Sequence, residues 1–225
     1  MKKIKIIEDY LEELFPEPKC ELNYNNDYEL LISVMLSAQT TDKRVNEVTK
    51  VLWKEYPTLK LLKEADIKEI KNIVRPLGNF NKKAVFIKEI ATILVNEYNS
   101  KLPYDRKILE SLPGVGRKNV NVVFSELNIE PNIAVDTHVE RVSKRLKIVD
   151  KNDNVLKIEK HLRRIIKRGN WNKRHLQLVL FGRYYCKSLS PLCDTCKLKE
   201  LCNYYKGDIK NDIRRKEKCI DWKNR

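Results

Sequence analysis

The sequence predicts an all-α protein, and three observations support that prediction. Apolar residues recur at helical spacing in segment after segment, strand-like alternation is scarce, and residues that favour helix N-termini precede several of the apolar patterns. The sequence contains no Asn-Gly dipeptide of the kind that marks a β-hairpin. A chain of 225 residues, 42% of them hydrophobic, is long and apolar enough to fold around a buried core.

The first half of the chain contains several predicted helices. An apolar helical face begins at Leu30, and a second helix is expected to start at Thr41. Asp66 and Glu69 have the spacing of an N-terminal capping pair for the helix that follows them. After the break in the segment PLG, a long amphipathic helix is expected to run toward Tyr98.

A helix, a glycine turn and a second helix are predicted over residues 105–127. Asp105 is expected to cap the short segment RKILESL, and the apolar spacing after Gly116 predicts a buried helix. Asp136 stands where the next helix is expected to begin. Two more helices are expected, over residues 153–167 and 171–185.

The chain is strongly basic, with 46 Lys and Arg residues against 31 acidic residues and a net charge of +15. Such a charge favours a nucleic-acid partner, because neutralising phosphates releases condensed counterions. The alternative explanation of the charge is a Lys-rich composition inherited from an AT-rich genome, since Asn and Ile are also plentiful. No run of about eighteen apolar residues occurs, and the first segment turns acidic before a signal-peptide core could form. We expect no membrane association and an intracellular location, in the cytoplasm or nucleoid if the protein is bacterial.

Four of the six cysteines lie in one short loop with the spacing C-x6-C-x2-C-x5-C: Cys186, Cys193, Cys196 and Cys202. Four thiolates so close in sequence suit a [4Fe-4S] cluster or a structural zinc ion. The spacing favours iron–sulfur, since zinc sites more often use two C-x2-C pairs and only one is present. A disulfide remains the third alternative. Cys20 and Cys219 lie far away in sequence and are interpreted as ordinary thiols.

Three stretches, in this order, resemble the endonuclease III family of DNA base-excision glycosylases. They are LLISVMLSAQTTD (30–42), LPGVGRKNVNVV (112–123) with IAVDTHVERV (133–142), and GRYYCKSLSPLCDTCKLKELC (182–202). The match covers the chain from about residue 25 to 205, and the cysteine spacing is that of the family. The resemblance implies a two-lobed helix-hairpin-helix glycosylase fold with a C-terminal four-Cys cluster loop.

The resemblance also implies how the chain divides into lobes. Residues 22–130 would form a six-helix lobe that includes the helix-hairpin-helix at about 105–127. Residues 1–21 and 131–206 would form a second helical lobe around the cluster loop at 186–202, and DNA would cross the cleft between the lobes. Residues 207–225 are rich in Lys and Arg and are expected to form a basic tail.

The resemblance assigns the chemistry to two residues. Lys118 would attack C1′ of the sugar, expel the base and form a Schiff base; taken by itself, the local sequence more often means a phosphate-binding lysine. Asp136 would assist its deprotonation and stabilise positive charge at C1′, while its position also makes it a good helix N-cap. Gly114 and Gly116 are expected to adopt positive φ and to bring main-chain N–H groups, with the cation of Arg117, close to phosphates.

Three further residues are candidates for contact with the DNA. Gln39 corresponds to a family residue that enters the gap left by the extruded nucleotide, although a polar surface residue at a helix end is the plainer interpretation. Asn79 stands where the family usually inserts an apolar wedge, and this departure leaves Leu77 or Phe80 as alternative wedges. His138 either lines the site or is a packed histidine.

The combined prediction is a bifunctional DNA glycosylase and AP (β) lyase that removes oxidised or ring-saturated pyrimidines. Its cofactor would be a [4Fe-4S] cluster, and its partner double-stranded DNA containing damaged bases or abasic sites, with the protein acting as a monomer. Lys187, Lys197 and Lys199, interleaved with the cysteines, suggest that the cluster organises a DNA-contacting loop. The alternatives are a relative that prefers mismatched adenine or thymine, a noncatalytic DNA-binding module, and an electron carrier.

Overall fold

The computed structural model describes residues 2–208, and every regular element in that range is a helix. The described part of the chain divides into two compact units: unit 1 comprises residues 2–19 and 131–208, and unit 2 comprises Cys20–Glu130. The predicted all-α class is confirmed for the described residues. Cys219 and residues 209–225 of the predicted basic tail lie outside them. No helix in the described range is long and apolar enough to cross a membrane.

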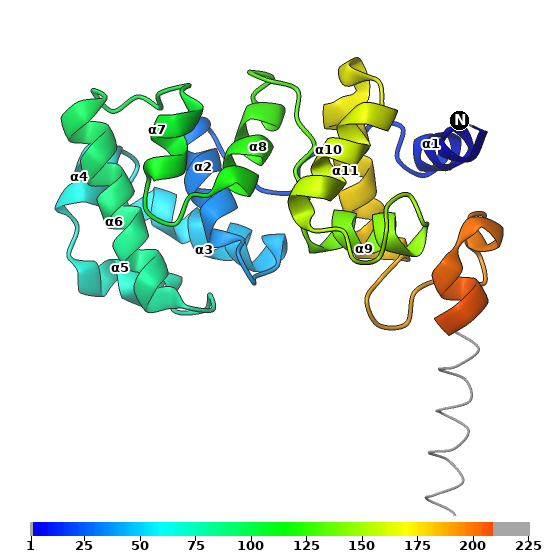
Figure 1. Ribbon diagram of the computed structural model, residues 1–225. Helices are drawn as coiled ribbons and strands as arrows, with labels where there is room; N and C mark the ends of the chain where they lie inside the picture. Colours follow the sequence, from blue (N-terminus) through cyan, green and yellow to red (C-terminus); the bar gives the residue numbers. More distant parts are fainter. Residues whose placement is uncertain (1, 209–225) are drawn as a thin grey trace, which may run out of the picture. The chain divides into compact units, whose positions relative to one another are not determined.

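Unit 2 is built around α2, whose residues from Glu29 to Leu36 are all buried. Helix α2 packs against α3 and α8, α7 packs against α8, and α6 lies alongside α4 and α5 (Figure 1). The helices of this unit are α2 (Asp27–Leu36), α3 (Asp42–Glu55), α4 (Leu59–Glu64), α5 (Ile67–Val74), α6 (Phe80–Glu97), α7 (Arg106–Ser111) and α8 (Arg117–Glu126).

Side-chain caps define where several of these helices begin. Thr41 caps α3, and Asp66 caps α5 by accepting a 2.8 Å hydrogen bond from the backbone N–H of Lys68. Glu69 does not complete the expected capping pair, because its carboxylate accepts a hydrogen bond from the Tyr56 hydroxyl at 2.7 Å. The short helix α4, capped by Thr58, was not predicted, since one and a half turns carry too little periodicity to detect.

Unit 1 gathers its helices around α11. Helix α11 packs against α1 and α9, and α10 packs against α9. The helices are α1 (Lys2–Leu14), α9 (Thr137–Arg145), α10 (Val155–Ile165) and α11 (Trp171–Leu180). This unit also contains four shorter helical turns. Two are 3-10 turns, η1 (Arg168–Asn170) before α11 and η3 (Lys199–Leu201), and two are π-helical turns, η2 (Phe181–Tyr185) and η4 (Tyr204–Asp208).

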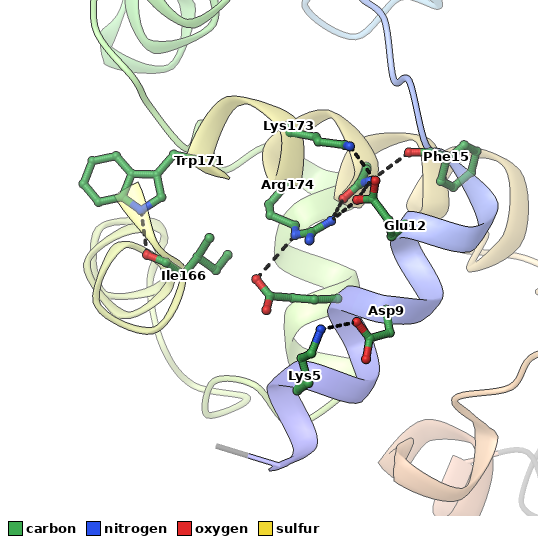
Figure 2. A network of polar contacts seen from close by, with 10 residues as sticks. Lys5, Asp9, Glu12, Phe15, Ile166, Trp171, Lys173 and Arg174 are labelled. Atoms are coloured by element: carbon green, nitrogen blue, oxygen red, sulfur yellow. Dashed lines mark hydrogen bonds and ion pairs between the residues drawn. The ribbon is translucent and has the colours of Figure 1, made fainter. Parts of the chain in front are cut away.

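A network of charged side chains fastens α1 to α11 (Figure 2). Glu12 of α1 accepts hydrogen bonds from Lys173 Nζ at 2.5 Å and from Arg174 Nη1 at 2.8 Å. The amide of Gln177 also donates to Glu12, at 3.1 Å. These three donors lower the pKa of Glu12 to about 2, with the Lys173 hydrogen bond the largest cause.

Candidate functional site

The turn between α7 and α8 fixes the backbone from which the predicted nucleophile projects. Asp105 caps α7, its Oδ1 accepting from the backbone N–H groups of Lys107 (2.8 Å) and Ile108 (3.0 Å). Gly114 has a φ of 73°, and a Cβ atom there would lie 2.5 Å from Cδ2 of Phe86. Both the positive φ and the close approach of the Phe86 ring require glycine at this position.

Gly116 has a different reason for its place in the turn. The prediction of positive φ was wrong here, because Gly116 is extended, with φ −119° and ψ 177°. Its N–H donates to Oδ1 of Asn119 at 3.1 Å, and Nδ2 of Asn119 donates to the carbonyl of Val34 at 3.2 Å. Asn119 therefore ties the start of α8 to α2, and Gly116 leaves that start without a capping side chain.

Lys118 lies in the first turn of α8 and is half-buried. Within residues 2–208 its amine has no hydrogen bond and no ion pair, and the first turn of α8 contains no acidic residue. Arg117 beside it is exposed. A lysine that is partly buried and engaged by no carboxylate has an amine that is available to a ligand.

Asp136 caps α9 through one of its two oxygens. Oδ1 accepts from the backbone N–H groups of His138 at 2.9 Å and Val139 at 2.8 Å. The predicted capping role is therefore confirmed. Oδ2 has no hydrogen-bond partner among the described residues, so this second oxygen of a half-buried carboxylate is left for another contact.

The ring of His138 is positioned by Arg141, a residue that the sequence analysis did not single out. Nη2 of Arg141 lies 3.1 Å from Nδ1 of His138 and also donates to the carbonyl of Gly182 at 2.7 Å. Nε of the same side chain donates to the carbonyl of Cys186 at 3.1 Å. A Cβ atom on Gly182 would lie 2.8 Å from Cβ of His138, so the two backbones are in close contact. Arg141 thus joins the start of α9 to the cysteine loop.

The four cysteines of the loop line one pocket. Its other walls are Leu146, Phe181, Tyr185, Pro191, Leu192, Lys199, Tyr204 and Tyr205. Burial raises the pKa of the Cys193 and Cys196 thiols, and the neighbouring thiols raise it further. Within residues 2–208 no three His, Cys, Asp or Glu side chains lie close enough together to hold a single metal ion.

Arg145, one helical turn beyond Arg141, contacts the cysteine pocket directly. Its Nη1 lies 3.5 Å from Sγ of Cys186 and donates to the carbonyl of Lys187 at 2.6 Å. The thiol of Cys202 donates to the carbonyl of Arg145 at 3.4 Å, and the guanidinium lies 3.8 Å from the ring centroid of Tyr204. A positive side chain therefore borders the thiols.

The lysines interleaved with the cysteines are not equivalent. Lys187 is exposed, whereas Lys197 forms an ion pair with Glu13 of α1 at 2.5 Å. Lys199 is half-buried in the wall of the cysteine pocket. Lys187 is therefore the most accessible of the three to a polyanion.

Gln39 and Asn79 are both exposed, and both have a left-handed backbone with φ of 56°. Leu77 is 1% exposed, and Phe80 is half-buried against the core of unit 2. Sequence reasoning missed Lys83, which is buried and binds the two residues that flank Gln39.

Comparison with known proteins defines the class first. Residues 32–168 match the HhH-GPD superfamily of base excision DNA repair proteins, so the helix–glycine turn–helix segment belongs to a DNA repair fold. Endonuclease III of Bacillus subtilis is 41% identical over 216 residues, which cover 96% of this chain and 99% of that protein. Endonuclease III of Rickettsia felis is 45% identical over 194 residues, covering 86% of this chain and 91% of its own.

A solved structure agrees with these relatives. A trapped covalent intermediate of endonuclease III with DNA superposes with a TM-score of 0.88 at 43% identity, covering 93% of this chain and 99% of the other. The chain belongs to the endonuclease III family. Family membership confirms the predicted fold, the DNA glycosylase and lyase class of enzyme, and DNA as the partner.

Proposed function

We propose that the protein removes oxidised or ring-saturated pyrimidines from double-stranded DNA and cleaves the backbone at the abasic site, acting as a monomer inside the cell. The observation that carries this proposal is the amine of Lys118, which stands beyond the Gly114 turn with no partner among residues 2–208. A phosphate-binding lysine needs only charge, whereas a nucleophile needs an unengaged, partly buried amine.

In the proposed reaction the uncharged amine of Lys118 attacks C1′ of the damaged nucleotide. The electrons of the C1′–N bond leave with the base, which takes up a proton. The sugar ring opens as the C1′–O4′ bond breaks, O4′ gains a proton, and a protonated Schiff base forms. Loss of a proton from C2′ then expels the 3′ phosphate with the electrons of its C3′–O bond. Water hydrolyses the Schiff base and frees the amine.

Asp136 supplies the assisting carboxylate in this proposal. Its Oδ1 is committed to capping α9, and Oδ2 would accept the proton from the ammonium of Lys118 and stabilise the positive charge that develops at C1′. His138, steadied by Arg141, would line the same side of the site as Asp136.

The base must first be rotated out of the duplex, which costs a few kcal/mol. The Gly114 turn and the uncapped start of α8 would let main-chain N–H groups approach a phosphate, with Arg117 adding positive charge. Gln39 and Asn79 would fill the gap that the extruded nucleotide leaves. Asparagine stacks on bases more poorly than an apolar wedge, so duplex opening would rely more on Gln39.

We propose that the four cysteines hold a [4Fe-4S] cluster. All four line one pocket, and the loop has one C-x2-C pair, whereas zinc sites, whose four ligands surround a single ion, more often have two. Each thiolate of a cluster instead binds a different iron. Its chemistry when bound is iron–thiolate bonding, which cross-links the loop that carries Lys187. Iron and sulfide analysis with visible absorption tests this, and stoichiometric zinc would contradict it.

Borohydride trapping tests the proposed function. A duplex containing thymine glycol, incubated with the protein and borohydride, should give a covalent complex. Lys118→Gln should abolish trapping and leave DNA binding measurable. Lys107→Gln is the matched control, since it removes an exposed positive charge from the same hairpin and should still trap. Absence of an adduct with the wild-type holoenzyme would contradict the lyase assignment.

A related specificity for mismatched adenine or thymine is the second candidate, and Asn79 in the wedge position is the observation that favours it. Lesions differ in how readily they leave the stack, so a weaker wedge favours bases that are already poorly paired. A panel of duplexes, each with one lesion or mismatch, decides between the two. Faster release of a mismatched base than of thymine glycol would replace the first specificity with the second.

A further inference from the structure

One buried lysine connects the two exposed turns of unit 2. Lys83 lies near the start of α6 and is 5% exposed. Its Nζ donates to the carbonyl of Ala38 at 2.9 Å and to Oγ1 of Thr40 at 3.0 Å, the two residues on either side of Gln39. Its backbone N–H donates to the carbonyl of Asn79 at 3.1 Å. That backbone bond is the first i→i−4 bond of α6, so the Lys83 side chain links the start of α6, which directly follows the Asn79 turn (75–79), to the Gln39 turn (37–40).

Both turns hold their exposed residue in a left-handed backbone conformation. Gln39 and Asn79 each have a φ of 56°, in the left-handed region that side chains other than glycine rarely adopt. Asparagine tolerates this region better than glutamine does. Such positions persist where the surrounding structure holds them, and at the Gln39 turn the bonds from Lys83 supply part of that hold.

The ammonium of Lys83 has no carboxylate partner within residues 2–208. Burial lowers the pKa of Lys83, and burial is the only cause of the shift. A buried charge without a counter-ion is costly, and an apolar chain of the same length would fill the space at less cost. A lysine at this position provides two Nζ hydrogen bonds that fix the geometry of the Gln39 turn. A methionine, which has an apolar chain of similar length, cannot provide them.

We propose that Lys83 is a positioning residue for duplex opening: it holds the Gln39 and Asn79 turns at a fixed spacing, so that both side chains fill the gap when a nucleotide rotates out. This inference rests on the proposed function, because it assigns a task to the two residues expected to enter the duplex. Lys83 acts through them and does not touch the reacting atoms.

The experiment compares Lys83→Met with a matched control, Lys88→Met, in the full-length holoenzyme. Lys88 lies on the same helix and also donates to a backbone carbonyl, that of Ala65, away from both turns. Lys83→Met should slow excision of thymine glycol from a duplex about tenfold or more, the effect of losing charged hydrogen bonds that hold the turn. Cleavage of an abasic site in a single strand, which has no stack to open, should stay within about twofold of wild type. Lys88→Met should change neither rate by more than about twofold.

A combination with Gln39→Ala separates positioning from general support of the fold. If Lys83 acts through the Gln39 turn, the double variant should lose little more duplex activity than Gln39→Ala alone, because residues acting through one element are not additive. Three results would overturn the inference. The losses of the two single variants could multiply in the double variant, Lys83→Met could lose equal activity on duplex and single strand, or Lys83→Met could keep wild-type activity on duplex.

A second variant covers the case in which Lys83→Met does not fold. Thr40→Val removes one of the two acceptors of the Lys83 ammonium while keeping the shape of the side chain. It should lower duplex excision in the same selective way by a smaller factor, and unselective loss or no loss would overturn the inference. Borohydride trapping of the wild type tests the proposed function separately. If no adduct forms, the proposed function is wrong. If the adduct forms normally but the variants do not lose duplex excision selectively, only the role of Lys83 is refuted.

Discussion

The N-terminus of α8 and the N-terminus of α9 carry the two proposed catalytic residues and are built in opposite ways. Helix α8 begins after Gly116 with no side chain capping it, and Lys118 in its first turn is unengaged among residues 2–208. Helix α9 begins with Asp136, whose Oδ1 accepts two backbone hydrogen bonds. The amine of Lys118, the proposed nucleophile, thus has no partner among residues 2–208, whereas the carboxylate of Asp136 is anchored through one oxygen.

This difference shows how one fold can cap a helix N-terminus and still leave a functional group available for a ligand. A helix N-terminus needs acceptors for its free N–H groups. At α9 the acceptor is half of a carboxylate whose other oxygen remains available. At α8 the turn is shaped by Gly114 and fastened by Asn119, and the first turn of the helix contains no acidic residue.

The anchored carboxylate gives the largest expected effect among the tests of this comparison. Asp136→Asn should slow base release about a hundredfold, because an amide cannot take the proton from Lys118. It should preserve the cap, since the amide oxygen can accept the same two bonds. Asp136→Ala should add a loss of about 1 kcal/mol in unfolding free energy. Single-turnover base release and urea unfolding measure the two effects, and normal base release by the Asn variant would contradict the assignment.

The two glycines of the hairpin provide a matched pair for the start of α8. Gly114→Ala should lower the unfolding free energy by about 2 to 4 kcal/mol, because its φ of 73° is strained for alanine and the new Cβ would meet Phe86. Gly116→Ala, extended and open, should change it by less than about 1 kcal/mol. Chemical unfolding of the two variants measures this, and equal losses would show that the hairpin geometry described is wrong.

The smallest expected effect concerns how the stability of unit 1, which carries α9, depends on acid pH. The pKa of Glu12 is about 2, below its ordinary value of 4.5, because Lys173, Arg174 and Gln177 donate to it. The stabilisation of the folded state by the ionised Glu12 carboxylate is therefore complete above pH 4.5 and is lost as pH falls from 4.5 toward 2. Glu12→Gln should lower the Tm at neutral pH slightly and flatten its dependence across that interval. An unchanged pH profile would show that this network contributes nothing to stability.

Local chemistry explains what the sequence could predict. The caps at Thr41, Asp105 and Asp136 were predicted correctly because each depends on an oxygen within a few residues of the N–H groups that it accepts. The helix beginning near Leu30 was also predicted, because its apolar period is visible within one segment, but its residues from Glu29 to Leu36 are buried on every face rather than on one. Family resemblance added the proposed role of Lys118 as nucleophile, whereas the local spacing of the cysteines already favoured an iron–sulfur cluster.

Contacts with distant backbone atoms could not be predicted. Lys83 donates to a carbonyl 45 residues away, and Arg141 donates to the carbonyl of Cys186, also 45 residues away. Every residue has a carbonyl, so the sequence does not mark which one will be the acceptor. Gly116 was misjudged for a related reason: its identity is visible in the sequence, but the contact of its N–H with Asn119, which in turn binds a carbonyl of α2, is not.

The most direct test of the account is the identity of the atom that bonds to the sugar. The borohydride-trapped complex with a thymine-glycol duplex would be digested, and the peptide that carries the reduced deoxyribose adduct would be sequenced by mass spectrometry. The account predicts the adduct on Nζ of Lys118. An adduct confined to another lysine, or to the terminal amine, would contradict it.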